Sequence, residues 1–223
     1  MMYLHILLLL PTIASQGIVY HLWKLGSNDG PTCLNDKLHM LQCVEPHVKL
    51  IDKTLDYFKE SLYYSRITPE SVIYNIGFVN KALQIGRNIS ECLGDGMECG
   101  GPKMVAYSLK HADYIGRKVY GDAFHCFINA ETIKTATQCL EHGHIQIDYR
   151  RLFDESNYYN ETTKALVECV AEKMKVTPSC TMDRMVSLYQ GAQALFELYN
   201  RGGKWGMGEQ VDLDYHPENY CDN

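Results

Sequence analysis

The cysteines constrain this chain more than any other feature, because eight of its nine cysteines fall into two sets that match in order. The tetrapeptide QCVE at 42–45 recurs as QCLE at 138–141, and an Ile-Asp pair follows both at the same distance. Towards the end of each stretch, KMVA at 103–106 and RMVS at 184–187 follow a cysteine at identical spacing. Such a series of matches in one order indicates an internal duplication.

We therefore predict two tandem repeats, residues 31–121 and residues 122–203, with four cysteines in each. The first repeat carries extra residues around 68–83. A unit of this size buries a small core and gains much of its stability from covalent links. We expect two disulfides within each repeat and none between repeats, although sequence alone leaves three ways to pair four cysteines. The predicted disulfide cysteines are Cys33, Cys43, Cys92 and Cys99 in the first repeat and Cys126, Cys139, Cys169 and Cys180 in the second.

Apolar residues recur at intervals of three and four along most of the chain, which predicts helices. The clearest stripes lie at 72–83, 105–119 and 185–199, and the pair Gly202-Gly203 is expected to end the last one. Only residues 144–149 alternate like a strand, and the matching segment of the first repeat has a helical pattern. We predict an all-α fold of two tandem disulfide-stapled helical units, with about three to four helices in each.

The N-terminus has the layout of a secretory signal peptide over residues 1–14. An apolar run at 6–10 is followed by a proline and by small residues that end at Ala14, where we expect cleavage. The apolar run is too short to span a bilayer, and no other segment approaches the roughly 18 apolar residues that a span needs. Residues 15–30 are expected to form a flexible lead-in, and residues 204–223 form an acidic tail without an apolar period.

Several features together predict a secreted, extracellular protein. Nine cysteines in a chain with a signal peptide are typical of a disulfide framework in an oxidising compartment. Two glycosylation sequons begin at Asn88 and Asn160, and we expect both asparagines to be exposed and to carry glycans. The net charge of −6 argues against a nucleic-acid partner, which usually requires a basic face.

Two groups of residues have side chains that could act as metal ligands. His142 and His144, with His125 nearby in sequence, have side chains that bind zinc or copper. We favour a polar loop here, because two ligands do not make a metal site. The second group is the set of tail carboxylates, which lacks the ligand spacing of an EF-hand and is interpreted as a solvated tail. Its members are Asp212, Asp214, Glu218 and Asp222.

Cys221 has no counterpart in the two matched sets. A free exposed thiol rarely persists in an oxidising compartment, so we expect this cysteine to be capped or joined to a second chain. A disulfide-linked homodimer through Cys221 is the first prediction. The alternative is a capped thiol or an intrachain bridge to a cysteine near the lead-in such as Cys33.

Two stretches resemble the paired cysteines of stanniocalcins, a family of secreted helical glycoprotein hormones. They are CLN at 33–35 leading to Cys43, and CVA at 169–171 followed by CT at 180–181 and RM at 184–185. The resemblance implies a disulfide-linked homodimeric factor that acts on ion transport or on a protease partner. The chain departs from the family in its two-copy layout, in the spacing between Cys43 and Cys92, and in its smaller cysteine count. No residue-level function carries over.

No common catalytic motif is present in the sequence. It contains no Gly-x-Ser-x-Gly elbow, no His-Glu-x-x-His pair, no phosphate loop and no dinucleotide-binding glycine pattern. We therefore predict a non-enzymatic protein without a cofactor, which binds an extracellular protein partner or acts as a signalling factor. The alternative is a structural protein of an extracellular matrix or fluid, and a third hypothesis is an unrecognised secreted hydrolase.

Overall fold

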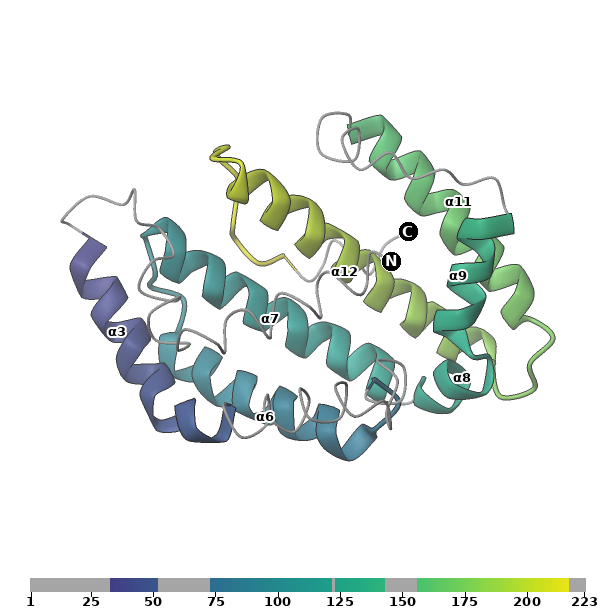
Figure 1. The fold of residues 1–223 in the computed structure, drawn as a ribbon, viewed down its shortest axis with the longest axis horizontal. Coiled ribbons are helices and arrows are strands. Elements are labelled where there is room, and N and C mark those ends of the chain that lie inside the picture. Colours follow the sequence, from purple (N-terminus) through teal and green to yellow (C-terminus); the bar gives the residue numbers. More distant parts are fainter. Residues whose placement is uncertain (1–32, 52–72, 122, 143–155, 217–223) are drawn as a thin grey trace. The chain divides into compact units, whose positions relative to one another are not determined.

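A computed structural model describes the chain over residues 33–51, 73–121, 123–142 and 156–216. Within these ranges the chain forms seven α-helices and one 3-10 helix, and no strand. The chain divides into two compact units, Met1–Asp113 (unit 1) and Tyr114–Asn223 (unit 2), and each contains two disulfides. The predicted all-α fold of two tandem disulfide-stapled helical units is confirmed (Figure 1).

Several sequence predictions concern residues outside the described ranges. The predicted signal peptide at 1–14, the lead-in at 15–30, the strand-like segment at 144–149 and Cys221 all lie there. Within the described ranges, none of the helices has the length and apolar character needed to cross a membrane.

Unit 1 is built from three helices that lie side by side in Figure 1. They are α3 (Leu34–Val44), α6 (Ile76–Leu93) and the first part of α7 (Gly100–Tyr120), with the 3-10 helix η2 (Glu45–His47) directly after α3. The apolar faces of the three helices meet in one continuous core, because each contributes residues spaced by three or four positions. The buried members of this core are Met40, Cys43, Val44, Ile85, Ile89, Leu93, Met97 and Ala106.

Helix α6 begins within the apolar stripe that the sequence places at 72–83. Asn75 has an extended backbone and its side chain accepts a hydrogen bond from the N–H of Phe78 at 3.1 Å. This is an N-cap, which starts a helix by satisfying one of its free N–H groups. The buried face of α6 consists of Ile85, Ile89 and Leu93, which lie later in the chain than the stripe suggests. Ile76, at the start of the helix, is exposed.

Unit 2 contains four further helices and the end of α7. They are α8 (Phe124–Asn129), α9 (Thr132–His142), α11 (Ser156–Met174) and α12 (Met182–Gly206). Helix α11 packs on α9 and on α12, and α12 also packs on α8. The long α12 thus contacts two of the other three helices and organises the unit.

The boundary between the units falls inside α7, at Asp113 and Tyr114, whereas the repeat pattern places it between residues 121 and 122. A close contact with α12 accounts for the difference. A Cβ added to Gly191 would lie 2.9 Å from Cγ2 of Val119, so only a glycine allows this approach. The last two turns of α7 therefore pack with unit 2, although the sequence pattern groups them with the first repeat.

The C-terminal end of α12 differs from the sequence prediction. The pair Gly202-Gly203 was expected to end the helix, but α12 continues to Gly206. The termination comes at Gly208, which has a positive φ of 85°. Two backbone hydrogen bonds, from Glu209 N–H to the Lys204 carbonyl and from Gly208 N–H to the Trp205 carbonyl, form a Schellman motif there. Glycines at 202–203 are tolerated because neighbouring turns keep the helical hydrogen bonds.

The expected disulfide bonds are confirmed, and their pairing follows the same order in both units. In each unit the first cysteine pairs with the fourth and the second pairs with the third, so no bridge joins the two units. The bridges are Cys33–Cys99 and Cys43–Cys92 in unit 1, and Cys126–Cys180 and Cys139–Cys169 in unit 2. An equivalent pairing order is what a duplicated unit would have.

A polar contact accompanies the corresponding outer disulfide in each unit, from a residue three positions after the first cysteine. In unit 1, Oδ2 of Asp36 accepts hydrogen bonds from the N–H groups of Glu98 at 2.9 Å and Cys99 at 3.0 Å. In unit 2, Nδ2 of Asn129 donates to Oγ of Ser179 at 3.1 Å. Each contact joins the segment after the first cysteine of the unit to the segment at the fourth cysteine. The contact uses a carboxylate in unit 1 and a side-chain amide in unit 2.

Candidate binding surfaces

The segment after α12 turns back along that helix, and we call residues 211–216 the strap. Asp212 contacts Arg201 near the end of α12, whereas Tyr215 packs against Ala194, about two turns earlier in the helix. The chain direction in the strap is therefore opposite to that of α12. The solvated tail that the sequence indicates is not what these residues form.

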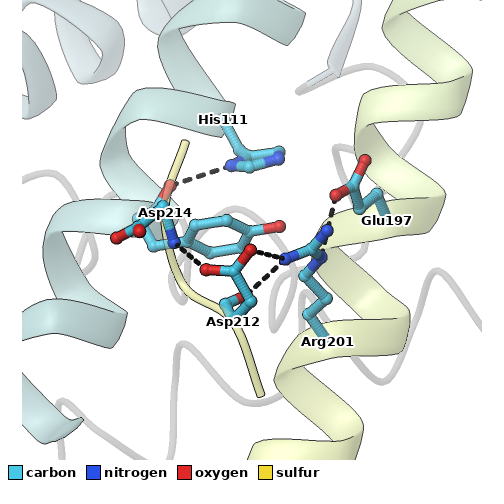
Figure 2. A network of polar contacts seen from close by, with 6 residues as sticks. His111, Glu197, Arg201, Asp212 and Asp214 are labelled. Carbon is cyan, nitrogen blue, oxygen red and sulfur yellow. Dashed lines mark hydrogen bonds and ion pairs between the residues drawn. The ribbon is translucent and has the colours of Figure 1, made fainter. Parts of the chain in front are cut away.

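Arg201 clamps the strap to the helix (Figure 2). Its Nε lies 2.8 Å from Oε1 of Glu197, one helical turn earlier. Its Nη1 donates a hydrogen bond to the backbone carbonyl of Asp212 and lies 3.6 Å from Oδ2 of the same residue. One guanidinium therefore binds a helix carboxylate and a strap residue at once, which its fork of five donors allows.

Asp212 is held in its ionised form. Its Oδ1 accepts a hydrogen bond from the N–H of Asp214 at 2.9 Å. This bond is the main cause that lowers the pKa of Asp212 below its usual value of 3.8; burial opposes it, and the charges of Arg201 and His216 lower the pKa further. The carboxylate thus orders the strap backbone and pairs with the clamp.

Two apolar side chains anchor the strap. Leu213 is only 6% exposed. Tyr215 packs against the cluster formed by Tyr114 and Ala194, which Ile115 also joins. Over four successive residues, the strap therefore combines an ionic contact, a main-chain hydrogen bond and two buried or half-buried apolar groups.

A second surface lies at the start of α12, where large apolar side chains face solvent. Val176 in the preceding turn is 83% exposed, Met182 is 68% exposed and Val186 is 45% exposed. We call these three residues the α12 patch. They flank Cys180, whose disulfide with Cys126 fixes the turn. Met182 and Val186 lie one helical turn apart on α12, and large exposed apolar groups on one helix face often mark an interaction site.

Unit 1 exposes apolar residues beside its corresponding disulfide. Leu34 and Leu38 lie one turn apart on α3, directly after Cys33, and both are exposed. In unit 1 the exposed side chains follow the first cysteine of the outer bridge, whereas in unit 2 they surround the last one. Both units therefore expose apolar side chains beside the outer disulfide, unit 1 on α3 and unit 2 at the start of α12.

The three histidines weighed against a polar loop in the sequence lie only partly within the described ranges. His125 is exposed on α8, and His142 is the last residue of α9. The side chain of His142 and all of His144 lie outside the described part of the chain. In the described ranges, no three or more His, Cys, Asp or Glu side chains group together in a way that could hold a metal ion.

The two sequons lie on corresponding helices of the two units. Asn88 is exposed on α6, where its Oδ1 accepts a hydrogen bond from Nε2 of Gln84 at 2.9 Å. Asn160 lies in the second turn of α11, and its side chain is outside the description. An exposed Asn88 is accessible for a glycan, whose presence stays a prediction for both positions.

Sequence reasoning missed the strap because it considered only helical periodicity after residue 203. A signal was present in the alternation of VDLDY at 211–215, where Leu213 and Tyr215 are two positions apart. Period-two patterns indicate an extended segment with one apolar side. Arg201 was not singled out, because a charged residue at a helix end is common and only its contacts distinguish it.

No family model, curated protein or solved structure matches this chain. The resemblance to stanniocalcins therefore stays a prediction. Functional inference depends on the residues themselves.

Proposed function

We propose that this protein is a secreted, non-enzymatic glycoprotein that acts as an extracellular binding protein or signalling factor. The observation that carries the proposal is the α12 patch, with Val176, Met182 and Val186 exposed on a scaffold braced by disulfides. Exposing large apolar side chains to water is unfavourable, and a partner that covers them removes this cost. The flexible thioether of Met182 adapts to the shape of a partner surface.

The sequence supports the extracellular part of the proposal. The signal-peptide pattern, the two sequons and the four intramolecular disulfides all suit an oxidising, secretory environment. The lack of common catalytic motifs favours binding over catalysis. A homodimer linked through Cys221 would present two copies of the patch and raise its apparent affinity through avidity.

The first test concerns secretion. The full chain with its own N-terminus should appear in the medium of a eukaryotic secretory host, with a mass that glycosidase lowers in two steps. It should remain in solution without denaturant. Retention in the insoluble extracellular fraction until reductant or denaturant releases it would support the structural matrix protein instead.

The second test concerns the patch. Labelled protein should bind saturably to the surface of cultured cells, and excess unlabelled protein should displace it. The combined substitution Val176→Ser, Met182→Ser and Val186→Ser should reduce this binding at least tenfold. The control is Leu34→Ser with Leu38→Ser on α3, which changes an exposed apolar pair of the other unit. Equal loss in both variants would reject the patch as the binding surface.

A further inference from the structure

The strap has the contacts of a bound peptide rather than those of a chain end lying on a surface. Arg201 donates to its main-chain carbonyl at Asp212 and pairs with the carboxylate of the same residue. Leu213 is buried, and Tyr215 packs against Tyr114. Main-chain contacts that fix an extended segment, combined with side-chain anchors that select its sequence, are how proteins recognise short peptides.

We infer that the strap is an intramolecular ligand of a peptide-binding site on unit 2, and that this site also takes an extended acidic peptide from a partner protein. We call the site the strap site; it consists of Glu197 and Arg201 of α12 together with Tyr114, Ile115 and Ala194. The inference rests on the proposed function, because it names a class of partner for an extracellular binding protein. The partner segment would carry an acidic residue, a large aliphatic residue directly after it, and an aromatic residue two positions further on.

Charge and geometry explain the acidic preference. Glu197 holds one edge of the guanidinium at 2.8 Å, which fixes the side chain and directs its other donors towards the strap. Arg201 is about one-quarter exposed, so its charge is only partly screened by water. A carboxylate at the position of Asp212 pairs with Nη1 of Arg201, whereas an amide there would lose the ionic part of the contact.

The anchors explain the aliphatic and aromatic preferences. Leu213 loses almost all its contact with water, so a polar residue at this position would forfeit the burial of an apolar side chain. Tyr215 contacts a ring and an alanine, which suits a flat aromatic group better than a branched one. The residue between them contributes its N–H to the Asp212 carboxylate, a contact that any residue except proline can make.

The covalent link gives the strap an advantage over any separate peptide. A segment tethered a few residues from its site has an effective concentration of about millimolar. A free peptide of equal intrinsic affinity must compete with the tethered strap. Its apparent affinity therefore falls in proportion to the fraction of strap sites that are open. The intact protein is therefore expected to bind such a peptide weakly until the strap is displaced.

The test uses the full chain and a strap-released variant, Leu213→Ser with Tyr215→Ser, which removes both anchors. The probe is a fluorescent peptide with the sequence of residues 209–216, EQVDLDYH, followed by fluorescence anisotropy. We expect the released variant to bind the peptide at least tenfold more tightly than the unmodified protein. A scrambled peptide of the same composition should not bind.

Arg201 is tested in the released background. Arg201→Gln should weaken peptide binding at least tenfold, while Arg117→Gln, an exposed arginine on α7, should leave it unchanged. Circular dichroism and mapping of the four disulfides establish that each variant is folded. If loss of both anchors prevents folding, a chain that ends at Gln210 and so lacks the strap serves as the second release variant.

Two results would overturn the inference. In one, the released variant is folded and proteases cleave its strap, but the variant does not bind the peptide. The other is equal binding of the scrambled peptide. Either result would make the strap a purely structural element. The proposed function would stand unaffected, because its own test uses the α12 patch.

Discussion

The two units use the same plan of helices and paired cysteines, but they place their sulfur atoms differently. In unit 1 a continuous cluster of apolar side chains fills the core, and one end of the inner bridge, Cys92, stays exposed. In unit 2 the core is divided into smaller clusters, and Cys126 and Cys139, both 0% exposed, belong to two of them. Both cysteines of the outer bridge of unit 2, Cys126 and Cys180, are buried members of its core, whereas both cysteines of the outer bridge of unit 1, Cys33 and Cys99, are half-buried and lie outside its core cluster.

Removing the outer disulfide tests this comparison with the largest expected effect. The loops closed by Cys33–Cys99 and Cys126–Cys180 span 66 and 54 residues. Loop entropy alone predicts a loss of about 4 kcal/mol for either bridge when both cysteines are replaced by alanine. The unit 2 variant also leaves a cavity at the buried Cys126 and Cys180, so we expect it to lose about 1 kcal/mol more.

The measurement is urea unfolding, with peptide-level hydrogen exchange to assign each transition to its unit. Each variant keeps the other three bridges and should remain folded at low temperature. A larger loss in unit 1 than in unit 2 would show that sulfur burial is not what separates the two cores.

Two glycines inside helices, one in each unit, should respond in opposite directions. Gly191→Ala in unit 2 places a Cβ 2.9 Å from Cγ2 of Val119, so we expect a loss of about 1–3 kcal/mol from overpacking. Gly86→Ala in α6 of unit 1 meets only Cδ2 of Leu109 at 3.5 Å, an ordinary contact. There the gain in helix propensity should stabilise by about 0.5–1 kcal/mol. Thermal unfolding of both variants checks the signs, and two losses of similar size would contradict the close approach of α7 to α12.

The polar contacts beside the outer disulfides give a smaller difference. Asp36→Ala removes two charge-assisted hydrogen bonds, for which we expect a loss of about 2 kcal/mol. Asn129→Ala removes one neutral hydrogen bond and should lose about 1 kcal/mol. Asp36→Asn is the control, since it keeps an acceptor without the charge and should fall between the two. Equal losses for Asp36→Ala and Asn129→Ala in chemical denaturation would remove this distinction between the units.

The smallest effect concerns two carboxylates whose pKa values are lowered for different reasons. Lys110 lowers the pKa of the exposed Asp95 in unit 1, whereas the backbone N–H of Asp214 is the main cause for Asp212 in unit 2. Salt at about 1 M screens charges beyond about 3 Å. We therefore expect the pKa of Asp95 to rise towards 3.8 in salt, while that of Asp212 changes less.

Titration of both carboxyl groups by NMR at low and high salt measures these shifts. A lowered pKa means that the contact stabilises the folded state at neutral pH and that this contribution disappears as the pH falls below about 3.8. The amide of Asp214 should therefore exchange faster in that acidic range. Equal salt sensitivity of the two carboxyl groups would show that the strap is held by charge alone.

The class of fold could be derived from the sequence because its signals are local. Helical periodicity depends on residues three and four positions apart, and it predicted the helices that contain residues 105–119 and 185–199. The matched cysteines predicted disulfides, and the order of their recurrence predicted two stapled units. The pairing itself needed the structure, since three pairings of four cysteines fit the same spacing.

The remaining features depend on contacts between residues that lie far apart in sequence. Neither the continuation of α12 through Gly202-Gly203 nor the approach of Val119 to Gly191 has a local signature, because both follow from how neighbouring helices pack. The burial of Leu213 follows from the turn at Gly208 and from the clamp of Arg201. By itself the sequence determined which segments are helical and that cysteines join them. Only the tertiary structure decided which side chains are covered, because burial is a property of what surrounds a residue in space.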